Sequence, residues 1–428
     1  MFEELKGKKL LYLGGIPRAK YVVSRARKLG IYVIVADYDP NSPAKQVADE
    51  GVLVNAVDVD ALEALCKEKH IDGVMSGYLD IMLPVLCELS KRLNLPCYMT
   101  DSMLKSATNK DYFKEMCNKY KVPVPQTYVL ESESIDDSAK ALPYPVFIKP
   151  LDSSGSRGAD VCYNEEDFKK KYEYALSFSK QKIVTIEDFL EGTEFILDYM
   201  IVDGVPYLAS MADRYVVEGR SKAINSPNLM VFPSKHLQRY KKDVEPAVCN
   251  MFRQEKFPAG VIFLQGYAGN KISFYETGCR LGGTWPYIDE YYHGINPMDM
   301  LFSHALTGKM LDEPSKGASI SADFKGKAAI IYFLANRKEA TIAKVKGLDE
   351  VEKLPYVVHV MEHHPEGEHY AMGTLTDVRF SAVHLVAETM EQLKERVKHI
   401  YSLVDYLDEN GDSLLAPVYD VDQLEGYE

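Results

Sequence analysis

The stretch Phe274-Tyr-Glu-Thr-Gly-Cys-Arg-Leu-Gly-Gly283 carries the most information about this chain. A short β-run, Ile272 to Tyr275, is expected to deliver Glu276 and Arg280 into a glycine-rich turn. The carboxylate can hold a divalent cation on a polyphosphate, and the guanidinium can hold an oxyanion beside it. The stretch therefore indicates a site that handles phosphate groups at the end of a β-strand.

A second segment has the composition of a phosphate-binding loop. Lys149 ends a predicted strand, and small residues follow it at Ser153, Ser154, Gly155 and Ser156. Small side chains let backbone N–H groups approach phosphate oxygens, and the lysine supplies a cation. The order differs from G-x-x-x-x-G-K-[ST], because the lysine comes first. Taken alone, the segment is also compatible with a surface loop.

A third segment has the features of an adenine-binding linker. An extended chain exposes backbone N–H and C=O groups that an adenine edge can use, and apolar side chains can cover the ring. An acid just past the next turn can accept hydrogen bonds from ribose hydroxyls. The residues are Glu187, Asp188, Phe189 and Leu190 for adenine and Glu194 for ribose. The alternative is an acidic, solvated hairpin.

Two predicted strands place metal ligands opposite each other. Gln265 and Glu276 lie on facing strands of one hairpin, so a carboxylate and a neutral amide oxygen can converge on a hard cation. Arg280 then lies near a transferred phosphoryl group or a substrate carboxylate, and Arg214 and Trp285 are candidates for the substrate pocket. Surface ion pairs and plain packing are the alternatives.

Composition excludes several classes of function. The 428 residues carry a net charge of −13, which disfavours non-specific binding to nucleic acid or anionic membrane. No run approaches the roughly 20 apolar residues of a membrane span, and a secretory signal is not expected. Seven scattered cysteines without a C-x-x-C pair fit reduced thiols in the cytoplasm.

The stretch 362–369, rich in His and Glu, favours an exposed hairpin over a zinc site because Pro365 and Gly367 make it a turn.

The first hundred residues alternate apolar runs with amphipathic stretches. This βαβαβ pattern predicts a doubly wound parallel sheet whose ligand edge lies at the carboxyl ends of the strands. Gly14-Gly15 is followed by Pro17 and Arg18 rather than by the glycines of a dinucleotide fingerprint, which disfavours an NAD site. A helix over 105–121, two hairpins across 203–204 and 266–270, and an α+β tail follow.

The order of these motifs resembles the ATP-grasp superfamily. The chain is similar to the halves of carbamoyl phosphate synthetase and to biotin carboxylase, and more closely to ATP-grasp L-amino-acid ligases. The resemblance implies a pre-ATP-grasp α/β domain at 1–100, an ATP-grasp domain at 101–315 with a flexible lid at about 125–192, and a C-terminal α+β domain at 316–428. The fold class expected is thus α/β and α+β, with a two-part central domain.

The resemblance also assigns roles to single residues. Lys110 matches the first nucleotide-binding lysine, and Lys149 matches the second, which reaches the α- and β-phosphates and takes part in catalysis. Ser153 to Gly158 match the loop that closes over the phosphates. Glu276 matches the metal-bridging glutamate and Arg280 the arginine that steadies the acyl phosphate or substrate. Gln265 and Gly278 depart from the acid and asparagine that many members carry, so only one strong metal ligand remains.

The resemblance implies an ATP-dependent carboxylate–amine ligase that uses Mg²⁺, with Mn²⁺ as a substitute. A carboxylate becomes an acyl phosphate, and an amine displaces phosphate, which needs positioning and charge neutralisation rather than a nucleophilic side chain. A bicarbonate-activating enzyme and a nucleotide-binding regulatory protein are the alternatives. Small-molecule substrates, no nucleic acid or membrane partner, a cytoplasmic location and a homodimer are expected.

Overall fold

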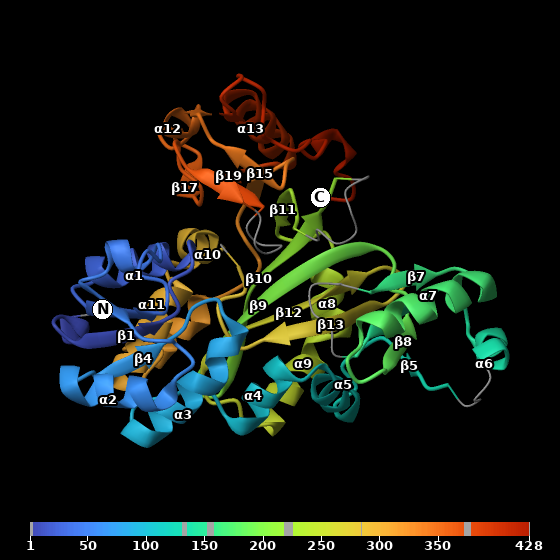
Figure 1. Cartoon of the computed structure of the whole chain (residues 1–428), viewed down its shortest axis with the longest axis horizontal. Helices are drawn as coiled ribbons and strands as arrows, with labels where there is room; N and C mark the ends of the chain where they lie inside the picture. Colours follow the sequence, from blue (N-terminus) through green and yellow to red (C-terminus); the bar gives the residue numbers. More distant parts are fainter. Residues whose placement is uncertain are drawn as a thin grey trace.

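The computed structural model describes residues 3–130, 135–151, 158–217, 226–283, 285–371 and 378–427. The predicted phosphate loop, Ser153 to Ser156, lies outside these ranges. The chain forms an N-terminal α/β unit, a long central sheet, a small sheet beside it and a C-terminal group of strands and helices (Figure 1). No helix among the described residues is long and apolar enough to cross a membrane.

The N-terminal unit is the predicted parallel sheet. Its strands run in the order β3-β2-β1-β4, and every neighbouring pair is parallel. Leu10 to Leu13 on β1 are buried, as expected for a strand covered by helices on both faces. The elements are β1 (Lys9–Leu13), α1 (Ala19–Lys28), β2 (Tyr32–Asp37), β3 (Glu50–Leu53), α2 (Val59–Lys69), β4 (Gly73–Met75) and α3 (Leu83–Leu93).

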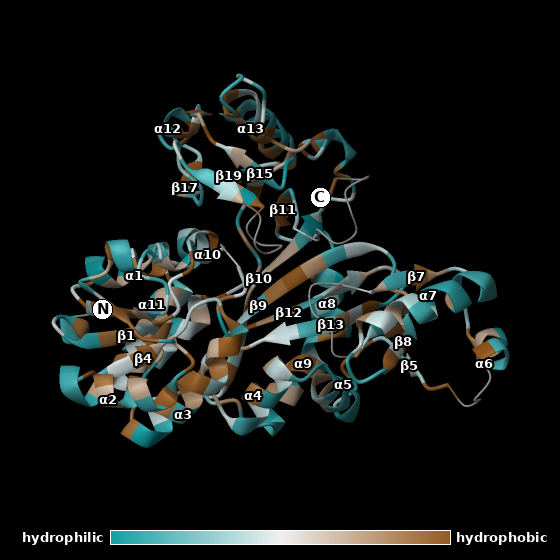
Figure 2. Ribbon diagram, viewed as in Figure 1, coloured by the Kyte–Doolittle hydropathy of each residue, from teal (hydrophilic) through white to brown (hydrophobic). Residues whose placement is uncertain are grey.

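The central sheet is antiparallel and has the order β13-β12-β9-β10-β11-β14-β19-β17. Both predicted hairpins are confirmed, and Asp203 and Gly204 both have positive φ at the turn between β9 and β10. The strands are β9 (Thr193–Val202), β10 (Val205–Tyr215), β11 (Leu229–Phe232), β12 (Gly260–Ala268), β13 (Ile272–Gly278), β14 (Lys327–Leu334), β17 (Val357–Glu362) and β19 (Arg379–Ala387). Hydrophobic residues gather along β9, β10 and β12 (Figure 2).

The predicted C-terminal domain joins this sheet directly. Strand β14 pairs with β11, so the ladder continues across the expected boundary at 315–316. The division into three domains stays a prediction. The remaining C-terminal elements are β15 (Glu339–Thr341), β16 (Lys344–Lys346), α12 (Leu348–Val351), β18 (His369–Ala371), α13 (Met390–Leu403) and β20 (Asp405–Leu407).

A second, small sheet lies within the predicted lid range. It has the order β5-β8-β6-β7 and a core of its own, which includes Val146, Ile148, Phe168 and Ile186. Its elements are β5 (Thr127–Tyr128), α6 (Ile135–Ala141), β6 (Val146–Pro150), β7 (Asp160–Cys162), α7 (Glu165–Phe178) and β8 (Val184–Asp188). A separate core lets this unit keep its shape independently of the long sheet.

The helix expected over 105–121 is two helices, which is a correction to the sequence-based prediction. The Asn109 side chain accepts hydrogen bonds of 3.0 Å from the backbone N–H groups of Asp111 and Tyr112, so it begins a new helix. The helices of this part of the chain are α4 (Asp101–Thr108), α5 (Lys110–Lys119), α8 (Leu237–Asp243), α9 (Glu245–Gln254), α10 (Pro286–His293) and α11 (Pro297–Thr307).

One arginine ties the N-terminal unit to the helices after the central sheet. Arg25 on α1 donates to Glu290 on α10 at 2.6 Å and to Asp299 on α11 at 2.5 Å. The Arg25 side chain is 19% exposed and that of Asp299 is 9% exposed, so water screens the pair only weakly. The arrangement fixes how the N-terminal sheet meets the central one.

Two buried carboxyl groups face each other between the central sheet and α10. Asp198 on β9 is 1% exposed and Asp289 on α10 is fully buried. Burial raises the pKa of Asp289 to about 8, and burial together with the charge of Asp289 raises the pKa of Asp198 well above its usual range. Both groups therefore favour their protonated forms at neutral pH.

Arg25→Leu should lower the free energy of unfolding by about 3 kcal/mol, because it leaves Asp299 buried without its cation. Arg27→Leu on the same helix is the control, because its pair with Asp49 is exposed and should contribute about 0.5 kcal/mol. Urea unfolding of the two variants provides the measurement. Equal losses would show that the Arg25 contacts do not join the units.

Asp289→Asn should stabilise the protein increasingly as the pH rises. Between about pH 4 and pH 8 the native protein keeps a proton that the unfolded chain has released, so wild-type stability falls with rising pH. The slope approaches about 1.4 kcal/mol per pH unit for one proton. Melting temperatures of wild type and variant between pH 5 and pH 8.5 should diverge. Melting temperatures that change in parallel with pH would contradict the raised pKa of Asp289.

Candidate nucleotide and substrate site

The helix break at Asn109 places Lys110 at the first residue of α5. Its Nζ atom lies 3.9 Å from Glu276 Oε1 on β13, so the first predicted lysine and the predicted metal ligand share one place. Their side chains are 62% and 41% exposed. A long contact between exposed groups contributes little stability, which leaves both groups available to a ligand.

A buried carboxylate holds the second predicted lysine. Lys149 Nζ on β6 lies 2.7 Å from Glu187 Oε1 on the paired strand β8. Lys114 on α5 donates to the same oxygen at 2.5 Å. Burial raises the pKa of Glu187, but the two lysines outweigh burial and hold it below its usual value. Two carboxylates, Glu187 and Glu276, therefore stand among three lysines, and the remaining positive charge suits a polyphosphate.

Lys114 was not among the sequence-based candidates. It lies one helical turn after Lys110, so both side chains point from the same face of α5. That spacing is the signal that could have found it. The pKa of Lys149 is lowered by burial, opposed by Glu187 and lowered further by Lys114 and Lys110, so these charges all act on one place.

Glu194 is engaged by protein groups. Its Oε1 atom accepts hydrogen bonds from Gln265 at 2.7 Å, from the Tyr275 hydroxyl at 2.5 Å and from Arg214. The residue is 6% exposed. A ribose contact would therefore use the other carboxylate oxygen. Arg214, expected in the substrate pocket, pairs with Glu194 at this position.

The chemistry of the hairpin fits one bound cation. Gln265 and Glu276 are direct cross-strand partners, as predicted, just before a β-bulge. The Gln265 amide nitrogen donates a hydrogen bond to Glu194. The Gln265 amide oxygen therefore remains as a metal ligand beside the Glu276 carboxylate. Among the described residues, no group of three or more His, Cys, Asp or Glu side chains could hold a metal ion by itself. A divalent cation here would need oxygens from the nucleotide as well.

Gly278 leaves no room for the asparagine that many relatives were expected to carry there. A Cβ atom at this position would lie 2.3 Å from the Phe263 ring. The packing of β13 on β12 thus explains the glycine and removes one further metal ligand.

Arg280 is held by an acid from the N-terminal unit. Its Nε donates to Asp80 Oδ1 at 2.6 Å, and its Nη1 donates to the Leu281 carbonyl at 2.9 Å. Asp80 follows β4, at the carboxyl edge of the parallel sheet where ligands were expected. The Arg280 Nη2 atom also donates to Asp80 Oδ2 at 2.5 Å, so Asp80 holds the guanidinium with both carboxylate oxygens. Asp80 was missed because its partner lies 200 residues away.

One residue of the predicted adenine linker, Asp188, makes hydrogen bonds within the small-sheet unit. The Asp188 carboxylate accepts from the Tyr128 hydroxyl at 2.5 Å and from Gln126 N at 3.1 Å. Phe189 and Leu190 follow the strand and are half-buried. The Phe189 ring meets Tyr163 edge-on, with centroids 6.4 Å apart.

Trp285 is buried at 4% exposure and packs in a hydrophobic cluster with Phe263. A Cβ atom at Gly283 would lie 2.0 Å from its ring. This geometry favours the packing alternative for Trp285 over a pocket wall.

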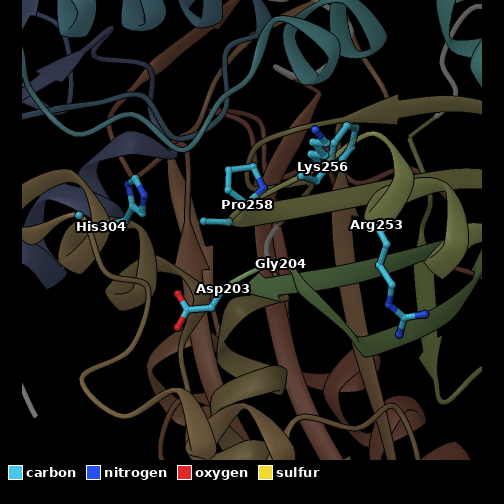
Figure 3. A pocket seen from close by; sticks show the side chains of 9 residues that line it. Asp203, Gly204, Arg253, Lys256, Pro258 and His304 are labelled. Carbon is cyan, nitrogen blue, oxygen red and sulfur yellow. The ribbon is translucent and has the colours of Figure 1, made fainter.

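A separate hollow of about 410 Å³ lies at the turn between β9 and β10. Asp203 and His304 stand on one side of it and Arg253 on the other (Figure 3). None of the predicted site residues lines it, so it is not part of the nucleotide site.

The long antiparallel sheet, the small sheet beside it and the lysines between them define an ATP-grasp fold. Residues 109–243 match the family of the carbamoyl-phosphate synthase L chain, ATP binding domain. Residues 10–96 match the PylC-like, N-terminal domain. Both matches agree with the ATP-grasp architecture of the fold.

Known proteins support the fold assignment. A formate-dependent phosphoribosylglycinamide formyltransferase of Sulfurisphaera tokodaii is 29% identical over 188 residues, which is 43% of this chain and 47% of that protein. The chain thus matches about half the length of this curated relative.

Two solved structures cover nearly the whole chain. An L-amino acid ligase from Bacillus licheniformis has a TM-score of 0.73 at 17% identity, covering 95% of this chain and 100% of that one. The biotin carboxylase domain of the Hydrogenobacter thermophilus 2-oxoglutarate carboxylase, in complex with MgADP, ADP and bicarbonate, has a TM-score of 0.75 at 16% identity, covering 94% and 91%. These likenesses confirm the fold.

Proposed function

We propose that the protein is an ATP-dependent ligase that joins a carboxylate to an amine, with release of ADP and phosphate. One observation carries the proposal. Lys114 and Lys149 share Glu187, Lys110 lies beside Glu276, and Arg280 stands just after the strand that carries Glu276. Surplus positive charge next to the half-exposed Glu276 carboxylate suits MgATP, and the arginine suits an acid that receives its phosphoryl group.

Each nucleotide contact follows from this assignment. Lys110 and Lys149 neutralise the phosphates. Lys114 shares the Glu187 carboxylate, so Glu187 neutralises the charge of Lys149 only in part. Adenine lies along Glu187 to Leu190, and Glu194 faces the ribose with its second oxygen.

Glu276 and the amide oxygen of Gln265 would hold a divalent cation together with the nucleotide. When bound, Mg²⁺ or Mn²⁺ would neutralise charge on the phosphate oxygens. One strong carboxylate holds one cation better than two, so a single tightly held ion is expected.

The reaction needs no covalent protein intermediate. A substrate carboxylate oxygen attacks the γ-phosphorus, the bond to the β-phosphate oxygen breaks, and an acyl phosphate and ADP form. The amine nitrogen then attacks the acyl carbon, the C–O bond breaks, and the departing phosphate takes the proton. Arg280 stabilises charge on the acyl phosphate because Asp80 already orients its guanidinium.

A regulatory, nucleotide-binding protein is the second candidate. Metal binding is weakened in two ways, because Phe263 leaves room only for glycine at Gly278 and because Glu194 holds the Gln265 amide nitrogen. A weak metal site favours nucleotide binding without turnover. A bicarbonate-activating enzyme is the third, supported by fold likeness alone.

ADP release separates these candidates. The purified protein is incubated with MgATP and pairs of amino acids, other carboxylates and amines, or with bicarbonate, and products are identified by mass spectrometry. A pair-dependent amide supports the ligase, and bicarbonate-dependent ADP without an amide supports the third candidate. ATP binding with no ADP under any condition would leave the regulatory role. A homodimer in the cytoplasm is proposed, and light scattering tests the assembly.

Lys149→Met should raise the Kd for ATP about tenfold or more, because it removes a cation from the phosphates. Glu187 keeps Lys114 as a partner, so the fold should survive. Lys119→Met is the matched control, because Lys119 lies at the other end of α5, is 64% exposed and pairs with Glu255 at the end of α9. Calorimetry measures both affinities. Unchanged affinity in the Lys149 variant would remove this lysine from the site.

Arg280→Lys should lower kcat about 100-fold with little change in the Kd for ATP. Lysine keeps the charge but loses the planar fork that Asp80 orients. Calorimetry and product formation are measured on the same preparation. If ATP affinity falls in proportion to the rate, Arg280 binds the nucleotide and not the substrate.

A further inference from the structure

Two of the seven cysteines differ from the others in position and exposure. All seven lie in the described part of the chain, where Cys87 and Cys97 are half-buried and the other five are buried. Cys87 is on α3, and Cys97 lies in the segment that joins α3 to α4 (Figure 1). A small reagent can reach a half-buried thiol, whereas a buried thiol serves as packing. This pair is therefore the part of the cysteine set that can react from solution.

The chain folds back along α3 after that helix ends, which brings the two thiols together. The Leu95 backbone N–H bonds the Ser90 carbonyl at 2.9 Å. Cys97 then lines a small cavity together with Leu86, the residue before Cys87. A hydrogen bond joins the Cys87 and Cys97 side chains. Two sulfur atoms in such contact need move little to form a disulfide, whose S–S bond is about 2 Å long.

The hydrogen bond makes the two thiols unequal. It lowers the pKa of Cys97 below that of an ordinary thiol, burial opposes this, and the Met99 backbone N–H adds to the lowering. The same hydrogen bond and burial raise the pKa of Cys87. Burial raises the pKa of each of the five remaining thiols. Cys97 is thus the thiol most easily converted to the thiolate, which is the form that attacks a disulfide.

The segment that carries Cys97 also contacts the loop that carries Arg280. The next residue, Tyr98, is 6% exposed, and its hydroxyl donates to the Cys279 carbonyl at 2.9 Å. Cys279 immediately precedes Arg280. One buried hydrogen bond therefore connects the residue after Cys97 to the backbone beside Arg280.

We infer that Cys97 and Cys87 form a thiol–disulfide exchange site for a small-molecule disulfide, with Cys97 as the attacking thiol and Cys87 as the resolving one. The inference does not depend on the proposed function. Oxidation at this site moves the segment that holds Tyr98, and the hydrogen bond to Cys279 transmits that movement to the loop of Arg280.

The exchange takes place in two balanced steps. The Cys97 thiolate attacks one sulfur of the reagent, the S–S bond of the reagent breaks, and the departing thiolate takes up the proton that Cys97 released. The Cys87 thiolate then attacks the Cys97 sulfur, the bond between Cys97 and the reagent breaks, and a second thiol leaves with the proton from Cys87. Two protein thiols are oxidised to one disulfide, and one reagent disulfide is reduced to two thiols.

Peptide mapping of the folded, full-length chain tests the site without any substrate. Bis(2-hydroxyethyl) disulfide, a small neutral reagent, is added at neutral pH to wild type, Cys87→Ser, Cys97→Ser and Cys66→Ser. The remaining thiols are alkylated at successive times, and the peptides are identified by mass spectrometry. Cys66 is the matched control, because it is buried on α2 of the same N-terminal unit.

Wild type should form the disulfide between Cys87 and Cys97. Cys97 should react about tenfold or more faster than Cys66, because it is more exposed and more readily ionised. Cys87→Ser should keep the reagent bound to Cys97, because no resolving thiol remains. Cys97→Ser should leave Cys87 reduced, and Cys66→Ser should behave like wild type.

The single tryptophan reports on the neighbouring loop. A Cβ atom at Gly282, two residues after Arg280, would lie 2.6 Å from the Trp285 ring, so the ring packs against this loop. Tryptophan fluorescence should change when wild type is oxidised, return with dithiothreitol, and stay constant in Cys97→Ser. Unchanged fluorescence in fully oxidised wild type would refute the transmission to Arg280 and leave the exchange site in place.

Equal rates at Cys97 and Cys66 would overturn the inference. A disulfide that links other cysteines, or a reagent that stays on Cys97 of wild type, would also overturn it. Mapping of wild type alone decides these outcomes, so the test holds even where a serine variant does not fold.

Discussion

The buried carboxylate of Glu187 holds two ammonium groups that come from different parts of the fold, and the nucleotide site depends on this sharing. Lys114 belongs to α5 and Lys149 to the small sheet, so the contact joins the two as well as arranging charge. One acid between two lysines is enough to keep them together and too little to neutralise them. The fold thus creates attraction for a polyphosphate before any nucleotide arrives.

The sequence predicted the features that arise locally. Alternating strands and helices gave the parallel sheet, and the hairpin turn between β12 and β13 set Gln265 opposite Glu276. These inferences need only neighbouring residues, whose geometry is fixed by backbone hydrogen bonds. Lys110 was assigned by the family resemblance instead, because the helix cap at Asn109 was not recognised in the sequence.

The residues that escaped prediction act across elements. Asp80 meets Arg280, and Tyr78 meets Arg18, only because the N-terminal sheet is docked on the central hairpin. Docking depends on packed surfaces and on buried ions such as Arg25, and no spacing in one sequence reports them. Glu194 illustrates the same limit, since its role depends on Arg214 and Tyr275 from other strands.

The unbroken ladder from β13 to β17 fixes how far apart the residues at its two ends lie. Glu276 and Arg379 lie on strands of the same sheet, and strands cannot slide past each other without breaking their hydrogen bonds. The small sheet has a core of its own and stands outside this ladder. The separation between Glu276 and Arg379 is therefore set by the backbone of one sheet, so the β12–β13 hairpin and the C-terminal strands keep their spacing as a single piece.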